Sequence, residues 1–183
     1  LQRFFPGEAV VVNDIGAVAW FGEHPIVDLG GLATLSIARA KHFEMYKPPT
    51  AEAITASSAA SDVAIVYDDW FPDSLPKSWM RVGRWRIEEC RSCAFPVVSI
   101  YATRPEAFPR VIAALRAFTN ELPNDVRQEG RYMALPAHEA DGPLDEGDLV
   151  RIDMTYTPAR HETFITVVGP DGRIGYPAYE ALT

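Results

Sequence analysis

Short apolar runs alternate with polar or glycine-rich segments along the first half of the chain. Residues 8–13 and 62–67 are rich in β-branched side chains and end in polar ones, and residues 25–29 form a third run of this kind. Such runs are typical of short buried strands. Helix-compatible segments separate them, and the order strand, helix, strand, helix, strand predicts a parallel sheet with helical crossovers.

Helices are expected between these strands. Asn13 and Asp14 have side chains that can cap a helix over residues 15–21, and Thr50 can cap another helix that begins just after it. Residues 32–45 are also expected to be helical, because the two prolines that end helical structure come only after them.

The second half of the chain has a different pattern. Residues 79–88 and 95–103 predict the two strands of a β-hairpin, and residues 105–122 carry apolar side chains at helical spacing. Alternating apolar and polar positions predict further strands at residues 149–157, 164–168 and 174–176. We therefore expect a small three-layer α/β core domain with a short parallel sheet over residues 1–122. A β-rich C-terminal appendage over residues 123–183 is expected to pack on it.

Composition and charge narrow the class of protein. Of the 183 residues, 48% are hydrophobic and 23% are charged, which is ordinary for a globular domain and argues against disorder. The net charge of −8 repels phosphate backbones and anionic membrane surfaces, so no nucleic-acid partner is expected. No apolar run reaches the roughly 20 residues needed to cross a bilayer. Because the chain begins at Leu1 rather than Met, we expect a piece of a longer protein.

The sequence lacks the signatures of common catalytic and metal sites. It has no G-x-S-x-G, Walker A, G-x-G-x-x-G or H-E-x-x-H pattern. The histidines His24, His42, His138 and His161 share no metal-ligand spacing, and we expect all four to be exposed. No catalytic residue and no metal site are therefore predicted within this chain.

Three polar residues follow the first two predicted strands: Asn13, Asp14 and Asp28. Open α/β sheets bind ligands at the carboxyl ends of parallel strands, so these residues are candidate ligand contacts. A structural role is the commoner use of such positions. In that role Asp14 would cap a helix, and Asp28 would accept hydrogen bonds from loop amides.

The third predicted strand is followed by Asp68, Asp69, Trp70 and Phe71. Carboxylates accept hydrogen bonds from sugar hydroxyls and aromatic rings pack on sugar C–H faces, so Asp68, Asp69 and Trp70 are candidate sugar contacts. The commoner arrangement buries both aromatic rings in the core and leaves the two carboxylates in water.

Cys90 and Cys93 form a single C-x-x-C pair. One pair supplies only half of a four-cysteine zinc site. A disulfide across the predicted turn and two free thiols both stay open as interpretations. Redox catalysis is less favoured, because the segment after Cys93 has the pattern of a strand rather than of a helix.

Two elements between residues 10 and 32 follow an order found in a known family. The first contains Asp14, Gly16, Ala17 and Phe21. The second contains Asp28, Leu29, Gly31 and Leu32. In this order they resemble the soluble C-terminal domain of GT-C-type polytopic membrane glycosyltransferases, which are related to mannosyl- and arabinosyltransferases. The resemblance covers residues 8–75 well and residues 76–122 loosely.

This resemblance implies an accessory role. Enzymes of that kind take sugar from a polyprenyl-phosphate donor, and their catalytic carboxylate lies near the first membrane helices, outside this chain. The domain would lie on the extracytoplasmic (periplasmic) face of the inner membrane, beside its own transmembrane region. It would help to position a glycan or lipid-linked sugar acceptor. No cofactor is expected in this chain, although the parent enzyme could use a divalent metal.

Two other functions stay open. A stand-alone α/β enzyme or small-ligand domain would use Asp14, Asp28 and Asp68 at the strand ends, and it would need a well-formed pocket there. A structural or interaction module would have no such pocket and would contact another chain instead.

Overall fold

A computed structural model describes most of the chain. The described residues are 1–41, 47–87, 95–121, 143–144, 151–157, 162–168 and 174–177. They belong to two compact units, one made of residues 1–81 and 98–111 and the other of residues 82–97 and 112–183. This division differs from the boundary expected after residue 122, because the fourth strand and the longest helix each contribute residues to both units.

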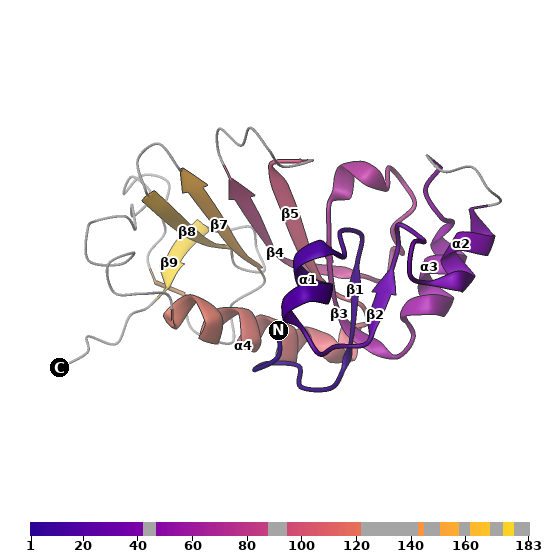
Figure 1. The fold of residues 1–183 in the computed structure, drawn as a ribbon. Helices are drawn as coiled ribbons and strands as arrows, with labels where there is room; N and C mark the ends of the chain where they lie inside the picture. Colours follow the sequence, from indigo (N-terminus) through magenta and orange to yellow (C-terminus); the bar gives the residue numbers. More distant parts are fainter. Residues whose placement is uncertain are drawn as a thin grey trace. The chain divides into compact units, whose positions relative to one another are not determined.

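The first unit is built on a short parallel sheet. Strand β1 (Ala9–Val12) pairs in parallel with β2 (Ile26–Asp28) on one side and with β3 (Ser61–Val66) on the other. Strand β5 (Val97–Ala102) runs antiparallel to β3, so the order is β2-β1-β3-β5 (Figure 1). The mixed α/β class and the parallel pairing predicted from the apolar runs are confirmed.

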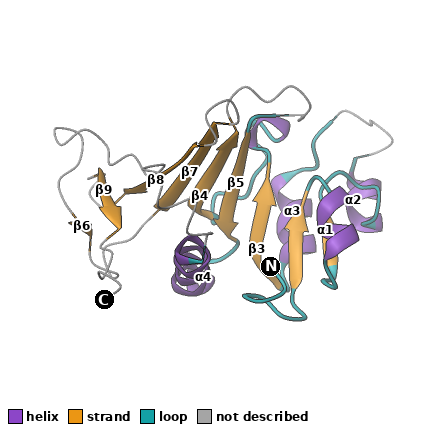
Figure 2. Cartoon of the chain, turned by 60° about the vertical axis from the view of Figure 1, so that its left-hand side comes forward, coloured by secondary structure: helices purple, strands orange, loops and turns teal. Residues whose placement is uncertain are grey.

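Three short helices connect the parallel strands. They are α1 (Gly16–Phe21), α2 (Leu35–Ala40) and α3 (Ala51–Ser58), and α2 and α3 pack against each other (Figure 2). Thr50 caps α3 as predicted, because its Oγ1 accepts the N–H of Ala53 at 3.3 Å. At α1 the N-cap position is Ile15, which makes no side-chain bond, and Asp14 one residue earlier accepts the N–H of Gly16 at 3.2 Å. Helix α2 begins three residues later than expected, and the expected extension over residues 42–45 lies outside the described residues.

The second unit is rich in strands. Strand β4 (Met80–Ile87) pairs in parallel with β7 (Arg151–Thr157), which pairs antiparallel with β8 (Glu162–Val168). Strand β9 (Ile174–Pro177) continues the antiparallel pairing, and β6 (Pro143–Leu144) adds a short parallel edge. The strands predicted near the end of the chain are therefore confirmed. The turn expected between β4 and β5 falls in residues 88–94, outside the described residues.

A short 3-10 helix, η2 (Pro105–Ala107), leads into helix α4 (Phe108–Asn120). Pro109 lies in the first turn of α4, where its missing N–H has no intrahelical partner to lose. Close packing leaves room only for glycine at position 83 in β4, because a Cβ there would overlap the carbonyl oxygen of Ile152 and the side chain of Leu115.

Buried aliphatic and aromatic side chains form the core of the first unit. The members are Val11, Leu29, Ile37, Ile54, Ala64, Val66, Phe71 and Trp79. Val10, Val11 and Val12 are all buried although successive side chains of a strand point to opposite faces. Strand β1 is therefore covered on both faces, as is usual for parallel sheets.

Ion pairs hold the amino-terminal end of β3. Buried Asp62 accepts hydrogen bonds from Arg104 and from Arg110, the latter at 2.9 Å. Arg110 also pairs with Glu8, and its guanidinium lies 5.0 Å from the centre of the Phe5 ring. The charged groups of these residues at the amino-terminal end of β3 are therefore paired with one another.

Candidate functional site at the carboxyl ends of β1 and β3

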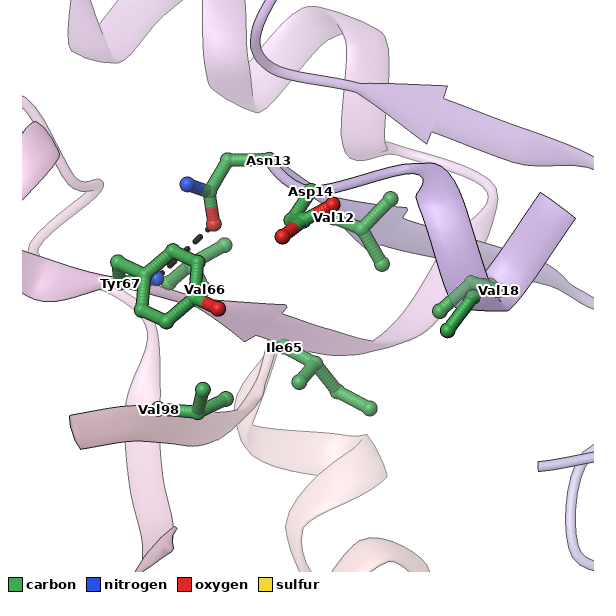
Figure 3. A pocket seen from close by; sticks show the side chains of 9 residues that line it. Val12, Asn13, Asp14, Val18, Ile65, Val66, Tyr67 and Val98 are labelled. Carbon is green, nitrogen blue, oxygen red and sulfur yellow. Dashed lines mark hydrogen bonds between the residues drawn. The ribbon is translucent and has the colours of Figure 1, made fainter. Parts of the chain in front are cut away.

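A pocket of about 190 Å³ lies within the first unit, where β1 and β3 end (Figure 3). It is lined by Val12, Asn13, Asp14, Ala17, Val18, Ile65, Val66, Tyr67 and Val98. Most of the wall is aliphatic, and the polar groups come from the two residues after β1 and the residue after β3. The pocket is therefore at the sheet edge where parallel α/β proteins bind ligands.

Asn13 joins the ends of two strands. Its side chain is 6% exposed, and its Oδ1 accepts the backbone N–H of Tyr67 at 2.9 Å (Figure 3). The amide nitrogen of Asn13 has no hydrogen-bond partner among the described residues. Since Tyr67 follows Asn13 by 54 positions, this bond ties the end of β1 to the end of β3 at the pocket. Asn13 thus has a structural role in the wall of a candidate site.

Asp14 supplies the carboxylate of the pocket. The residue is exposed, and its Oδ1 accepts the N–H of Gly16 at 3.2 Å. Burial raises the pKa of the Tyr67 hydroxyl, and the negative charge of Asp14 and a hydrogen bond with Asp14 raise it further. The Tyr67 hydroxyl therefore stays protonated at neutral pH. Asp14 lines the pocket and keeps further acceptor capacity that a ligand can use.

Asp28 has the structural role that its position suggested. It is only 1% exposed, and its Oδ1 accepts the N–H of Gly30 at 2.7 Å. Its Oδ2 accepts the N–H groups of Leu32 at 2.6 Å and Ala33 at 2.8 Å. These bonds fold the segment after β2 into a compact turn, which is why α2 starts later than the pattern predicted. Asp28 does not line the pocket.

Asp68 is engaged by neighbours on β5 and β4. Its Oδ2 accepts the hydroxyl of Ser99 at 2.6 Å, and its Oδ1 accepts the hydroxyl of Tyr101 at 2.9 Å. Arg81 adds an ion pair at 3.6 Å. Burial, followed by the charge of Asp68, raises the pKa of Tyr101 to about 12. This cluster fixes the short 3-10 helix η1 (Asp68–Trp70) to β5, and its carboxylate is not a member of the pocket wall.

The other two candidates after β3 both lie at the surface. Asp69 is exposed, and Trp70 is 40% exposed with its ring centre 6.0 Å from that of Tyr67. Phe71 is buried in the core. The expectation that both aromatic rings fill the core is therefore right for Phe71 and wrong for Trp70, whose ring is held beside Tyr67.

The family comparison gives one match. Residues 1–101, more than half of the chain, match the model of a domain of unknown function, DUF8728. The chain belongs to the DUF8728 family. No curated protein matches the chain, and no solved structure does so either.

All pocket residues, from Val12 to Val98, fall within the DUF8728 match. The sequence pattern identified Asn13 and Asp14 but missed Tyr67 and Val98. Tyr67 directly follows a buried strand, which is a signal that could have indicated it. Val98 carries no such local signal, because it reaches the pocket only through the antiparallel pairing of β5 with β3.

The expectation that His24 is exposed is wrong. The side chain is 8% exposed rather than solvent-facing, and its Nδ1 lies 3.2 Å from the carbonyl oxygen of Glu8. His42, His138 and His161 lie outside the described residues, as do Cys90 and Cys93, so the disulfide and free-thiol interpretations are both left standing.

The described part of the DUF8728 chain offers no metal site or membrane span. There, no group of three or more His, Cys, Asp or Glu side chains could hold a metal ion. Within the same residues, no helix is long and apolar enough to span a membrane.

Proposed function

We propose that the chain is a glycan-binding accessory domain of a membrane glycosyltransferase that uses a polyprenyl-phosphate sugar donor. In this role the domain lies on the extracytoplasmic face of the membrane, next to the transmembrane region of its own parent protein. It positions a glycan or lipid-linked acceptor and does not catalyse transfer itself. The motifs around Asp14 and Asp28 support this proposal through their resemblance to such domains.

The pocket at the end of β1 and β3 is the observation that carries the proposal. A sugar presents hydroxyls on its edge and C–H groups on its faces. Asp14 can accept hydrogen bonds from hydroxyls, while Val18, Ile65 and Val98 offer an apolar wall to a C–H face. A volume of about 190 Å³ is below the roughly 300 Å³ at which drug-sized pockets begin, which suits one sugar unit.

The carboxylates support a binding role rather than a hydrolytic one. Glycoside hydrolysis generally needs two carboxyl groups that flank the scissile bond. Asp14 is the single carboxylate among the residues that line the pocket. Asp28 and Asp68 are committed to hydrogen bonds elsewhere in the first unit. A single carboxylate can bind and orient a sugar without cleaving it.

The test is to titrate the isotope-labelled chain with short mannose- and arabinose-containing oligosaccharides and to follow amide shifts by NMR. We expect shifts at residues 12–18 and at Tyr67, and no transfer of sugar from a polyprenyl-phosphate donor. Val18→Trp should fill the pocket from helix α1 and abolish the shifts, because Val18 lines it. Ala19→Trp is the matched control, since Ala19 is exposed on the same helix and does not line the pocket. Transfer by the isolated chain, or equal binding by both variants, would refute the proposal.

A stand-alone small-ligand domain is the second candidate. The observation that favours it is that the whole pocket lies within one compact unit, so binding needs no other part of a parent protein. Hydropathy of the coding sequence on either side of this chain separates the two. Several apolar segments of about 20 residues support the glycosyltransferase, and their absence favours the stand-alone domain.

A further inference from the structure

The charge of the pocket is not compensated by the protein. Among its lining residues, Asp14 is the single charged side chain, and none is Lys, Arg or His. Asp14 accepts a hydrogen bond from a neutral group, the N–H of Gly16. Within the described residues, no ion pair involves Asp14. A ligand in this pocket therefore meets one unpaired negative charge.

Other features of the pocket and of the chain also favour a cationic ligand over an anionic one. The aliphatic wall has no group that competes with a ligand for the Asp14 carboxylate, and water screens this charge because Asp14 is exposed. The ring of Tyr67 lies in the wall, with Trp70 next to it, and aromatic faces attract cations. A phosphate would find no cation to pair with and would be repelled by Asp14. The net charge of −8 acts in the same direction at longer range.

We infer that the pocket selects a sugar that carries a free amino group and discriminates against phosphorylated sugars. This inference rests on the proposed function, because it names the class of sugar that the same pocket takes. The ammonium group lies against the Asp14 carboxylate, and the ring of the sugar lies against Val18 and Val98. In a lipid-linked acceptor, the phosphate-bearing end therefore stays outside the pocket and the glycan end enters it.

Matched probes separate charge from shape. Glucose and glucosamine differ in one hydroxyl and one amino group, glucose 6-phosphate adds a negative charge, and cyclohexylamine keeps the ammonium on a ring without hydroxyls. Each is titrated into the whole labelled chain at a pH below the pKa of the amine. Because Asp14 is exposed, we expect glucosamine to bind about three- to tenfold more tightly than glucose, with a smaller ratio at high salt. Glucose 6-phosphate should bind most weakly.

The variants test whether Asp14 is the cause. Asp14→Asn keeps an oxygen for the N–H of Gly16 and removes only the charge, so the preference for glucosamine should disappear. Asp73→Asn is the control, because it changes the net charge equally and does not line the pocket. Asp73 has a φ of 61°, a conformation that asparagine adopts well.

The outcomes distinguish the inference from the proposed function. Equal binding of glucose and glucosamine, or tightest binding of glucose 6-phosphate, overturns the amino-sugar inference and leaves a glycan-binding domain. Loss of the preference in Asp73→Asn as well as in Asp14→Asn also overturns it, because the effect is then one of net charge. Binding of cyclohexylamine alone supports selection of ammonium but overturns the glycan-binding function. Binding of no probe at the pocket overturns both.

Discussion

Replacing Asp28 with asparagine should destabilise the first unit, because one side-chain oxygen that accepts two hydrogen bonds becomes an amide nitrogen. In the wild type, Oδ2 of Asp28 accepts the N–H groups of Leu32 and Ala33 at 2.6 and 2.8 Å. Asparagine can still accept the N–H of Gly30 through its remaining oxygen. Its NH₂ group then faces two donors inside a site that is 1% exposed.

The magnitude follows from the number of lost bonds. A hydrogen bond to a charged acceptor contributes about 1.5–3 kcal/mol, and an unpaired buried donor costs about 1–3 kcal/mol. Leu32 and Ala33 are themselves exposed, so water can hydrate their amides once the turn opens. We therefore expect a loss of about 3 kcal/mol in the free energy of unfolding. That is a large fraction of the roughly 5–15 kcal/mol by which domains are stable.

Urea unfolding and amide hydrogen exchange together test this reasoning. The midpoint of unfolding should fall at nearly constant m-value. Exchange of the Gly30, Leu32 and Ala33 amides should speed up more than that of β3 amides. Asp69→Asn is the control, because Asp69 is exposed and the change should stay within about 0.5 kcal/mol. Equal midpoints for the two variants would show that the Asp28 bonds do not hold the turn.

Two further changes probe packing and titration. Gly83→Ala should destabilise by about 3 kcal/mol in urea unfolding, because its Cβ overlaps the Ile152 carbonyl, whereas Gly16→Ala should have a neutral or slightly stabilising effect. No difference between the two glycines would contradict the close approach. The pKa of Tyr101 rises from 10.0 in the unfolded chain to about 12 in the folded protein. The protonated hydroxyl therefore contributes fully to the free energy of unfolding below pH 10, and this contribution is lost as the pH rises through about 12. The shift corresponds to about 2.7 kcal/mol, which partial exposure reduces to about 1–2 kcal/mol. Tyr101→Phe should flatten this alkaline decline in unfolding free energy, and an unchanged decline would exclude the Asp68 cluster as its source.

Local patterns along the chain predicted the elements well. The valines of β1 are typical of a buried parallel strand, and Thr50 sits before a helix start where its hydroxyl meets a free N–H. The valine run and the Thr50 cap both depend on neighbours within about four residues, so the local sequence is enough to predict the strand and the start of the helix. The same reasoning was less reliable for Asp14, where a helix cap was expected and a bond to Gly16 two residues on was found.

The candidate site was predicted only in part. Asn13 and Asp14 were identified because they follow a strand, and that edge of a parallel sheet commonly binds ligands. Whether they face a pocket, however, depends on residues that come much later in the chain. Asp28 ends a strand at the same edge and yet turns toward its own loop amides. Sequence position alone does not separate these two outcomes.

By itself the sequence determined the strands, the helices, the acidic charge and the set of polar residues at the strand ends. Those properties depend on side-chain size, branching and ionisation, and on contacts within a turn or two of the chain. Tertiary structure decided that Tyr67 and Val98 line the same pocket as Asp14, and that Ser99 and Tyr101 hold Asp68. These pairings follow from the register of β3 with β1 and β5. Register is a long-range choice that depends on burial of whole strand faces, which no short segment of the sequence can fix.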